Sequence, residues 1–187
     1  MTPTRVAWGI TGAGDYLVES LAAMKRVGAA PGVEVTVLLS KSGEMVVKWY
    51  RLWDDLSTSF KKVQVEKGPN HPFAAGALQV GHYALFFVSP ATANTVAKIA
   101  LGIADSLITN CVAQAIKGDT PVYIYPVDQA VGSQETTVPD GRRITITTRR
   151  IDVENVERLR EMEGITVLAH PSEIEAIIAA GGSPRIS

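Results

Sequence analysis

The stretch RVAWGITGAG at residues 5–14 decides the fold class of this chain. Its first six residues form a largely apolar run of strand length, and TGAG follows as a glycine-rich turn. Residues 16–27 then carry apolar side chains at helical spacing. This order predicts a buried strand that leads directly into a helix, which is the building unit of a parallel sheet covered on both faces.

The same alternation continues along the chain. Strands are predicted at residues 33–39, 83–88, 121–125 and 165–168, and helices at residues 43–51, 73–81, 93–104, 106–116, 153–162 and 171–180. Pro90 is expected to end the strand before it, and the polar residues 52–70 to form a connection with a short strand at 63–65. Because no repeat or low-complexity linker interrupts the pattern, we expect one doubly wound domain over residues 1–187.

The last third of the chain has a different pattern. Residues 136–150 alternate polar and apolar side chains around Pro139-Asp140-Gly141, a strong β-turn signal. We therefore expect a β-hairpin extension there. Asp152 is a candidate N-cap for the helix that follows, and Gly181-Gly182 a stop for the last helix.

Composition excludes several classes of protein. The 187 residues are 46% hydrophobic with a net charge of −1 and no long basic run, so binding to nucleic-acid phosphates is not expected. No apolar run reaches the length of a membrane span, and the N-terminus does not read as a secretory signal, so we expect a cytoplasmic protein. A single cysteine, Cys111, and three scattered histidines predict no metal site.

Three turns should meet at the carboxyl edge of the sheet, where doubly wound folds bind ligands. The first, GITGAG at residues 9–14, could hold a phosphate on its backbone and on the following helix N-terminus, or could be only a tight turn. Its spacing is G-x-x-G-x-G, which differs from the dinucleotide fingerprint. Ser40, not an acid, follows the second strand, so no group is present there to bind an adenosine ribose.

The other two turns are SPATANT at residues 89–95 and YPVDQ at residues 125–129. The small polar residues of the first offer donors to a ligand, and the plainer interpretation is a helix cap by Thr92 or Asn94. Asp128 in the second either accepts a hydrogen bond from a ligand or caps a turn. Each turn alone is ambiguous, but three at one edge indicate a binding site.

At PATANT (residues 90–95) and KIALGIAD (residues 98–105) the chain resembles the flavoprotein family of homo-oligomeric flavin-containing cysteine decarboxylases. The resemblance implies a flavodoxin-like doubly wound parallel sheet, non-covalent FMN and assembly built from trimers. Residues 96–103 of the helix after the motif are apolar on almost every side, so we expect this helix to be buried in such an oligomer. The implied FMN contacts are Thr11, Gly12, Ala13, Gly14, Ser40, Thr92, Ala93 and Asn94.

Three departures separate the chain from the decarboxylases. The family's catalytic histidine, fourteen residues before the motif proline, is replaced by Gly76. The Pro-x-Met-Asn segment after the fourth long strand is here Pro126-Val127-Asp128, and no cysteine stands in the C-terminal region. The flavin prenyltransferases carry a basic residue near the position of Val127, which is also absent. Decarboxylation and prenyl transfer therefore lack their main residues.

The opening RVAWGITGAG, the hairpin segment and the ending GITVLAHPSEI resemble archaeal-type flavoproteins and the dihydromethanopterin reductase (acceptor) branch. This resemblance implies an FMN-dependent oxidoreductase that reduces dihydromethanopterin to tetrahydromethanopterin. Electrons would come from a one-electron donor such as a ferredoxin-type protein. The alternatives are an FMN electron-transfer flavoprotein without a small substrate and a phosphopantothenoylcysteine-decarboxylase-like protein.

Several side chains are candidates for roles that the pattern does not decide. Asp15, Asp128 and His71 are candidate proton donors. Trp8 either flanks the flavin or packs in the core, and Cys111 is expected in the core. The aromatic patch of Trp49, Tyr50 and Trp53 could stack on a pterin, although a subunit interface is favoured. The basic pairs Arg142-Arg143 and Arg149-Arg150 form either a solvated face or a docking site for an acidic partner.

Overall fold

The computed structural model describes residues 2–181, and Met1 and residues 182–187, which include Gly182 of the predicted stop, lie outside the described part. The strands are β1 (Thr4–Ile10), β2 (Val33–Leu39), β3 (Lys62–Val65), β4 (Leu85–Ala91), β5 (Val122–Pro126), β6 (Gly132–Thr137), β7 (Arg143–Thr148) and β8 (Ile165–Val167). The helices are α1 (Leu17–Ala29), α2 (Lys41–Trp49), α3 (Trp53–Ser59), α4 (Ala74–Gln79), α5 (Ala93–Ala100), α6 (Leu107–Lys117), α7 (Arg150–Arg160) and α8 (Glu173–Ala179).

Six strands form one parallel sheet in the order β3-β2-β1-β4-β5-β8, and β6 pairs with β7 in a separate antiparallel hairpin. The predicted flavodoxin-like, doubly wound α/β fold with a hairpin extension is therefore confirmed. The chain leaves β1 toward β2 on one side and reaches β4 on the other, so the order reverses between β1 and β4. Ligands bind at such a switch point, beyond the carboxyl ends of the strands.

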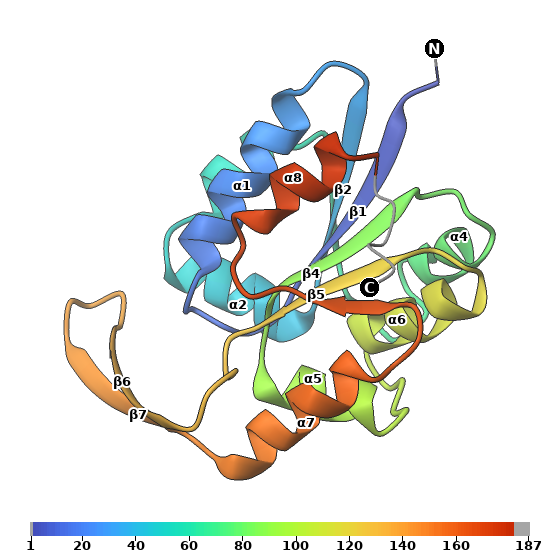
Figure 1. The fold of residues 1–187 in the computed structure, drawn as a ribbon. Coiled ribbons are helices and arrows are strands. Elements are labelled where there is room, and N and C mark those ends of the chain that lie inside the picture. Colours follow the sequence, from blue (N-terminus) through green and yellow to red (C-terminus); the bar gives the residue numbers. More distant parts are fainter. Residues whose placement is uncertain (1, 182–187) are drawn as a thin grey trace.

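Helices cover both faces of this sheet (Figure 1). One core packs α1, α2, α3 and α8 against side chains such as Trp8 and Ile10, and the other packs α4, α5, α6 and α7 against side chains such as Phe86 and Val88. Alternate residues of β1 and β4 thus enter opposite cores, because successive side chains of a strand point to opposite faces. The hairpin stands apart from these layers and projects from the molecule (Figure 1).

The segment predicted as a connection at residues 52–70 contains a helix, α3. Leu56 is the one buried residue of α3, so the segment has no apolar periodicity that sequence reasoning could detect. The helix forms because Leu56 enters the core between α1 and β2 while the polar side chains remain outside. The short strand expected at 63–65 is confirmed as β3, which runs Lys62–Val65.

Strand β4 continues through Pro90 to Ala91, so the prediction that Pro90 ends the strand is wrong. The register against β5 shifts between Val88 and Ala91, and the Pro90 carbonyl accepts hydrogen bonds from Thr11 of the neighbouring turn. A proline is tolerated here because the irregular register requires no N–H at that position.

Two predicted helix boundaries also change. Helix α5 ends at Ala100, not at residue 104, because Gly102 adopts a positive φ of 72° and turns the chain. Helix α7 begins at Arg150, with Arg149 as its N-cap and Asp152 inside the first turn. The Asp152 carboxylate accepts the Arg149 N–H at 3.1 Å, so it satisfies a free N–H from within the first turn rather than from the cap position.

Candidate functional site

The turns after β1 and β4 are joined by one buried side chain. Thr11 is 2% exposed, and its hydroxyl donates to the Pro90 carbonyl at 2.9 Å. The same oxygen accepts the Thr92 N–H at 2.9 Å, and the Thr11 N–H also reaches Pro90 at 3.3 Å. Thr11 therefore fixes the glycine turn against the start of α5 at the switch point of the sheet.

The glycine turn has a run of free donors. Within residues 2–181, the backbone N–H groups of Gly12, Ala13, Gly14 and Asp15 donate to no protein acceptor. Consecutive free N–H groups beside a helix N-terminus form an anion-binding concavity. The donor set of this turn therefore fits the phosphate of a mononucleotide.

Two glycines of this turn are required by packing. A Cβ on Gly12 would lie 2.8 Å from the Cβ of Ser42 in α2, and a Cβ on Gly14 would overlap the ring and hydroxyl of Tyr50. Neither glycine has a positive φ. The glycines thus let α2 and Tyr50 approach the turn, a reason that differs from the close approach of a phosphate expected from the sequence.

Ser40 lies beside this turn and caps α2. Its hydroxyl accepts the Gly43 N–H at 2.9 Å, and its own N–H donates to the Ile10 carbonyl. The carboxylate of Glu66 accepts the N–H of Lys41 at 3.1 Å and that of Leu107 at 3.0 Å, the first residues of α2 and α6. Since a carboxylate already holds these two helix starts, the glycine turn and α5 are the better place for an anion.

At the start of α5, Thr92 is the N-cap and its hydroxyl accepts the Thr95 N–H at 3.2 Å. Ala93 is half-buried and Asn94 is exposed, so the amide of Asn94 is free to meet a ligand or a second subunit. The motif residues therefore combine both interpretations, because Thr92 caps the helix while the side chain of Asn94 is accessible to a ligand.

The two candidate acids are both tied to the hairpin. Asp15 accepts a hydrogen bond from the Thr136 hydroxyl in β6, and Asp128 accepts one from the Thr148 hydroxyl in β7 at 2.9 Å. As acceptors these carboxylates hold the two strands of the hairpin to the carboxyl edge of the sheet. The structure thus brings Asp15 and Asp128 to the same edge, in anchoring positions that the sequence did not indicate.

His71, the third candidate, is exposed in the turn between β3 and α4, where its backbone pairs with Gly68. Within the described residues its ring makes no hydrogen bond or ring contact. Nothing in the structure joins His71 to Asp15 or Asp128. A different ring, that of His170, contacts Tyr16 and Tyr125 at centroid distances of 5.6 and 6.4 Å near the end of β5.

The aromatic residues of the sequence separate into different environments. Trp8 is fully buried and donates its indole N–H to the Ser89 carbonyl at 2.7 Å, so it belongs to the core. Trp49 is 53% exposed and, with Arg51 and the hairpin tip at Pro139 and Asp140, lines a pocket of about 270 Å³.

The remaining members of the predicted patch make different contacts. Trp53 lies under the ammonium of Lys48, with 4.9 Å from Nζ to the ring centroid. Tyr50 packs edge-to-face with Trp49, with 5.8 Å between the ring centroids, and directs its hydroxyl toward Gly14. Tyr50 is the residue near the candidate site that sequence reasoning missed, since only the fold brings it to the glycine turn.

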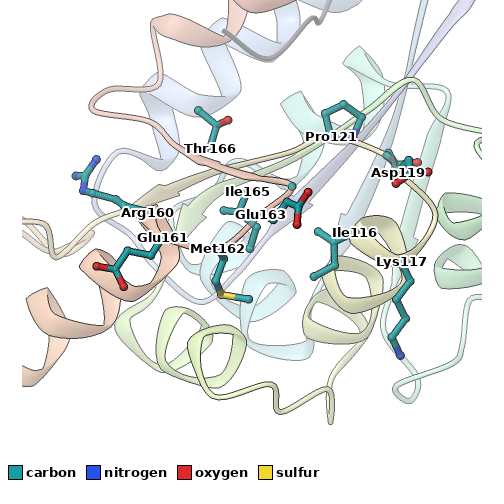
Figure 2. A pocket seen from close by; sticks show the side chains of 12 residues that line it. Ile116, Lys117, Asp119, Pro121, Arg160, Glu161, Met162, Glu163, Ile165 and Thr166 are labelled. Carbon is teal, nitrogen blue, oxygen red and sulfur yellow. The ribbon is translucent and has the colours of Figure 1, made fainter. Parts of the chain in front are cut away.

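A larger pocket, of about 970 Å³, lies at the opposite edge of the sheet (Figure 2). It opens between the amino ends of β5 and β8, with Ile116, Met162 and Ile165 among its lining and charged side chains such as Lys117 and Glu163 around them (Figure 2). None of the residues implied for FMN binding lines it. Ligands of doubly wound folds bind at the carboxyl edge, so we do not assign the cofactor to this pocket.

Cys111 and the arginines beside the hairpin were also singled out in the sequence. Cys111 is fully buried, and burial raises the pKa of its thiol to about 12, which confirms the core prediction. The arginines beside the hairpin form ion pairs: Arg142 with Asp140, Arg143 with Glu135, Arg149 with Asp152 and Arg150 with Glu154.

Across residues 2–181 no helix is long and apolar enough to cross a membrane, and no three His, Cys, Asp or Glu side chains gather as a metal site.

Comparison with known proteins gives consistent results. A family model described as "Flavoprotein" matches residues 1–185. An uncharacterized protein of Methanocaldococcus jannaschii is 53% identical over 93% of this chain and 94% of its own length. A dihydromethanopterin reductase (acceptor) of the same organism is 33% identical over 91% of this chain and 94% of its length.

The solved structure of DmrB from Burkholderia xenovorans, in complex with FMN and described as a cubic protein cage for redox transfer, matches the fold. Its TM-score is 0.80 at 32% identity, over 95% of this chain and 94% of that chain. The family match spans nearly the whole sequence, and relatives above 30% identity cover more than nine-tenths of the chain. The chain belongs to the flavoprotein family.

Proposed function

We propose that this protein binds FMN at the switch point between β1 and β4 and is an FMN-dependent reductase. The observation that carries the cofactor assignment is the run of free N–H groups from Gly12 to Asp15, fixed to the start of α5 by Thr11. Gly12, Ala13 and Gly14 would hold the phosphate end, with Thr92, Ala93, Asn94 and the hydroxyl of Ser40 nearby. The FMN complex of DmrB supports this assignment.

The substrate that we propose is a dihydropterin, which is reduced in the cytoplasm to a tetrahydropterin. The natural substrate would be dihydromethanopterin. Support comes from two relatives named dihydromethanopterin reductase (acceptor), at 33% and 31% identity. Bound FMN would supply the hydride. The chain itself orients the cofactor through the glycine turn and α5. Trp49, exposed beside the hairpin tip, offers an aromatic face for a planar substrate.

Electrons would enter one at a time from a protein donor of the ferredoxin type. Support for this part is the absence from the sequence of the dinucleotide fingerprint that a direct NADH site uses. The DmrB structure, described as a cage for redox transfer, supports a homo-oligomer. We propose an assembly built from trimers through the region of α5.

The test of the proposed function is an anaerobic half-reaction series. Purified protein should be yellow and release FMN, not FAD, on denaturation, because the end of β2 offers no acid for an adenosine ribose. A one-electron reductant should bleach the flavin, and dihydropterin should then restore its colour with one pterin reduced per flavin. Full bleaching without reoxidation by dihydropterin would identify an electron-transfer flavoprotein instead, and released FAD would reject the cofactor assignment.

A further inference from the structure

Tyr50 ends α2 with its phenol against the glycine turn. Its ring packs on the core formed with α1, β1 and β2, and its hydroxyl occupies the volume that a side chain at position 14 would need. We propose that Tyr50 is a cofactor-contacting residue whose hydroxyl hydrogen-bonds FMN in the site beside Gly14. This inference rests on the proposed FMN function and adds a residue that the sequence motifs do not contain.

The hydroxyl of Tyr50 is available for a ligand. Within residues 2–181 it makes no hydrogen bond, although the side chain is only half-exposed and the buried hydroxyl of Thr11 in the same turn is paired. A partly buried tyrosine hydroxyl normally finds a partner. Its neighbour in the turn is Gly14, whose N–H donates to no acceptor within the described residues. The hydroxyl and this N–H group therefore form one set of unsatisfied donors beside the same turn.

Burial and a nearby charge keep the phenol protonated. Burial, together with the negative charge of Asp15, raises the pKa of Tyr50 above its ordinary value. A neutral hydroxyl can donate a hydrogen bond to a phosphate oxygen. The carboxylates of Asp15 and Asp128 accept hydrogen bonds from Thr136 and Thr148.

The first experiment compares Tyr50→Phe with the wild type and with Tyr83→Phe. Tyr83 is also half-buried, but it precedes β4 at the opposite edge of the sheet. Loss of one hydrogen bond to the charged phosphate should weaken FMN affinity by about 12- to 150-fold in Tyr50→Phe. The same variant should bind riboflavin, which lacks the phosphate, as tightly as the wild type does. Tyr83→Phe should leave both affinities unchanged.

The second experiment moves the phenol without removing it. Gly14→Ala places a methyl group on the Tyr50 ring and hydroxyl, so it should displace the phenol and reproduce the loss of FMN affinity. In a Tyr50→Ala background the same change at Gly14 should have a smaller effect on FMN affinity, because the overlapping atoms are gone.

The outcomes separate the two proposals. If the wild type binds FMN and Tyr50→Phe matches it in FMN affinity, the role of Tyr50 is rejected while the proposed function stands. If Tyr50→Phe weakens FMN and riboflavin equally, or Tyr83→Phe weakens FMN as much, the effect is structural and the contact is rejected. A wild type that binds no FMN overturns both proposals.

Discussion

Replacing Thr11 with valine tests whether the two turns form one site. Valine keeps the shape of threonine but removes the oxygen that bridges Pro90 and Thr92. The Pro90 carbonyl keeps its bond to the backbone N–H at position 11, whereas the Thr92 N–H loses the one acceptor that it has within residues 2–181. The main cost is therefore an unsatisfied N–H at a partly buried position.

The expected loss of stability follows from the two hydrogen bonds that the Thr11 hydroxyl makes. A lost hydrogen bond costs about 1 kcal/mol, and an unsatisfied buried donor roughly 1–3 kcal/mol more, so about 3 kcal/mol is expected for Thr11→Val. For a domain of this size each kcal/mol lowers the melting temperature by roughly 2–4 °C, which gives a loss of about 6–12 °C. Because FMN must then also order the loosened turns, its affinity should fall by about tenfold, or 1.4 kcal/mol.

The matched control is Thr120→Val at the opposite edge of the sheet. Thr120 is 4% exposed and donates to the Leu78 carbonyl at 2.8 Å, and that carbonyl also accepts the Gly81 N–H. This variant should cost about 1 kcal/mol and leave FMN affinity unchanged. The assays are thermal unfolding of the apoprotein and titration of flavin fluorescence. Equal FMN affinity in the two variants, or wild-type stability in Thr11→Val, would refute the reasoning.

Three further predictions concern the start of α5, the assembly and its electron donor, and the ion pair between Arg149 and Asp152. Asn94→Asp should lower FMN occupancy more than Cys111→Ser, because it adds a charge at the accessible start of α5 while Cys111 is remote in the core; equal occupancy would count against this placement. The protein should elute as a multiple of three with little folded monomer, which light scattering checks. NADH alone should not bleach its flavin, which anaerobic spectra check. Arg149 lowers the pKa of Asp152 through a hydrogen bond. This pair therefore stabilises the fold at pH values above the ordinary pKa of an aspartate, and its contribution is lost as pH falls below about 4. Arg149→Met should therefore flatten the acid side of the stability curve, and an unchanged curve would reject the pairing.

The sequence alone was sufficient for the features that depend on near neighbours. Apolar runs of five to seven residues that end in small residues indicate parallel strands, and the turn at Pro139-Asp140-Gly141 indicates a hairpin. The glycine turn, Thr92 and Asn94 were predicted as site residues because motif and strand end coincide. Binding beyond the carboxyl ends of the strands is the prediction that the rules of doubly wound sheets add.

Contacts between distant segments were decided only by the tertiary structure. Thr11 and Thr92 are 81 residues apart, and Asp15 and Thr136 are 121 residues apart, so no local pattern records either bond. Helix α3 escaped prediction because a single buried leucine supplies no periodicity. Tyr50 reads in the sequence as part of an aromatic patch, and the packing of α2 against the β1 turn directs its hydroxyl to Gly14. Propensity and periodicity act over a few residues, whereas a binding site is assembled from loops that become neighbours only when the sheet has formed.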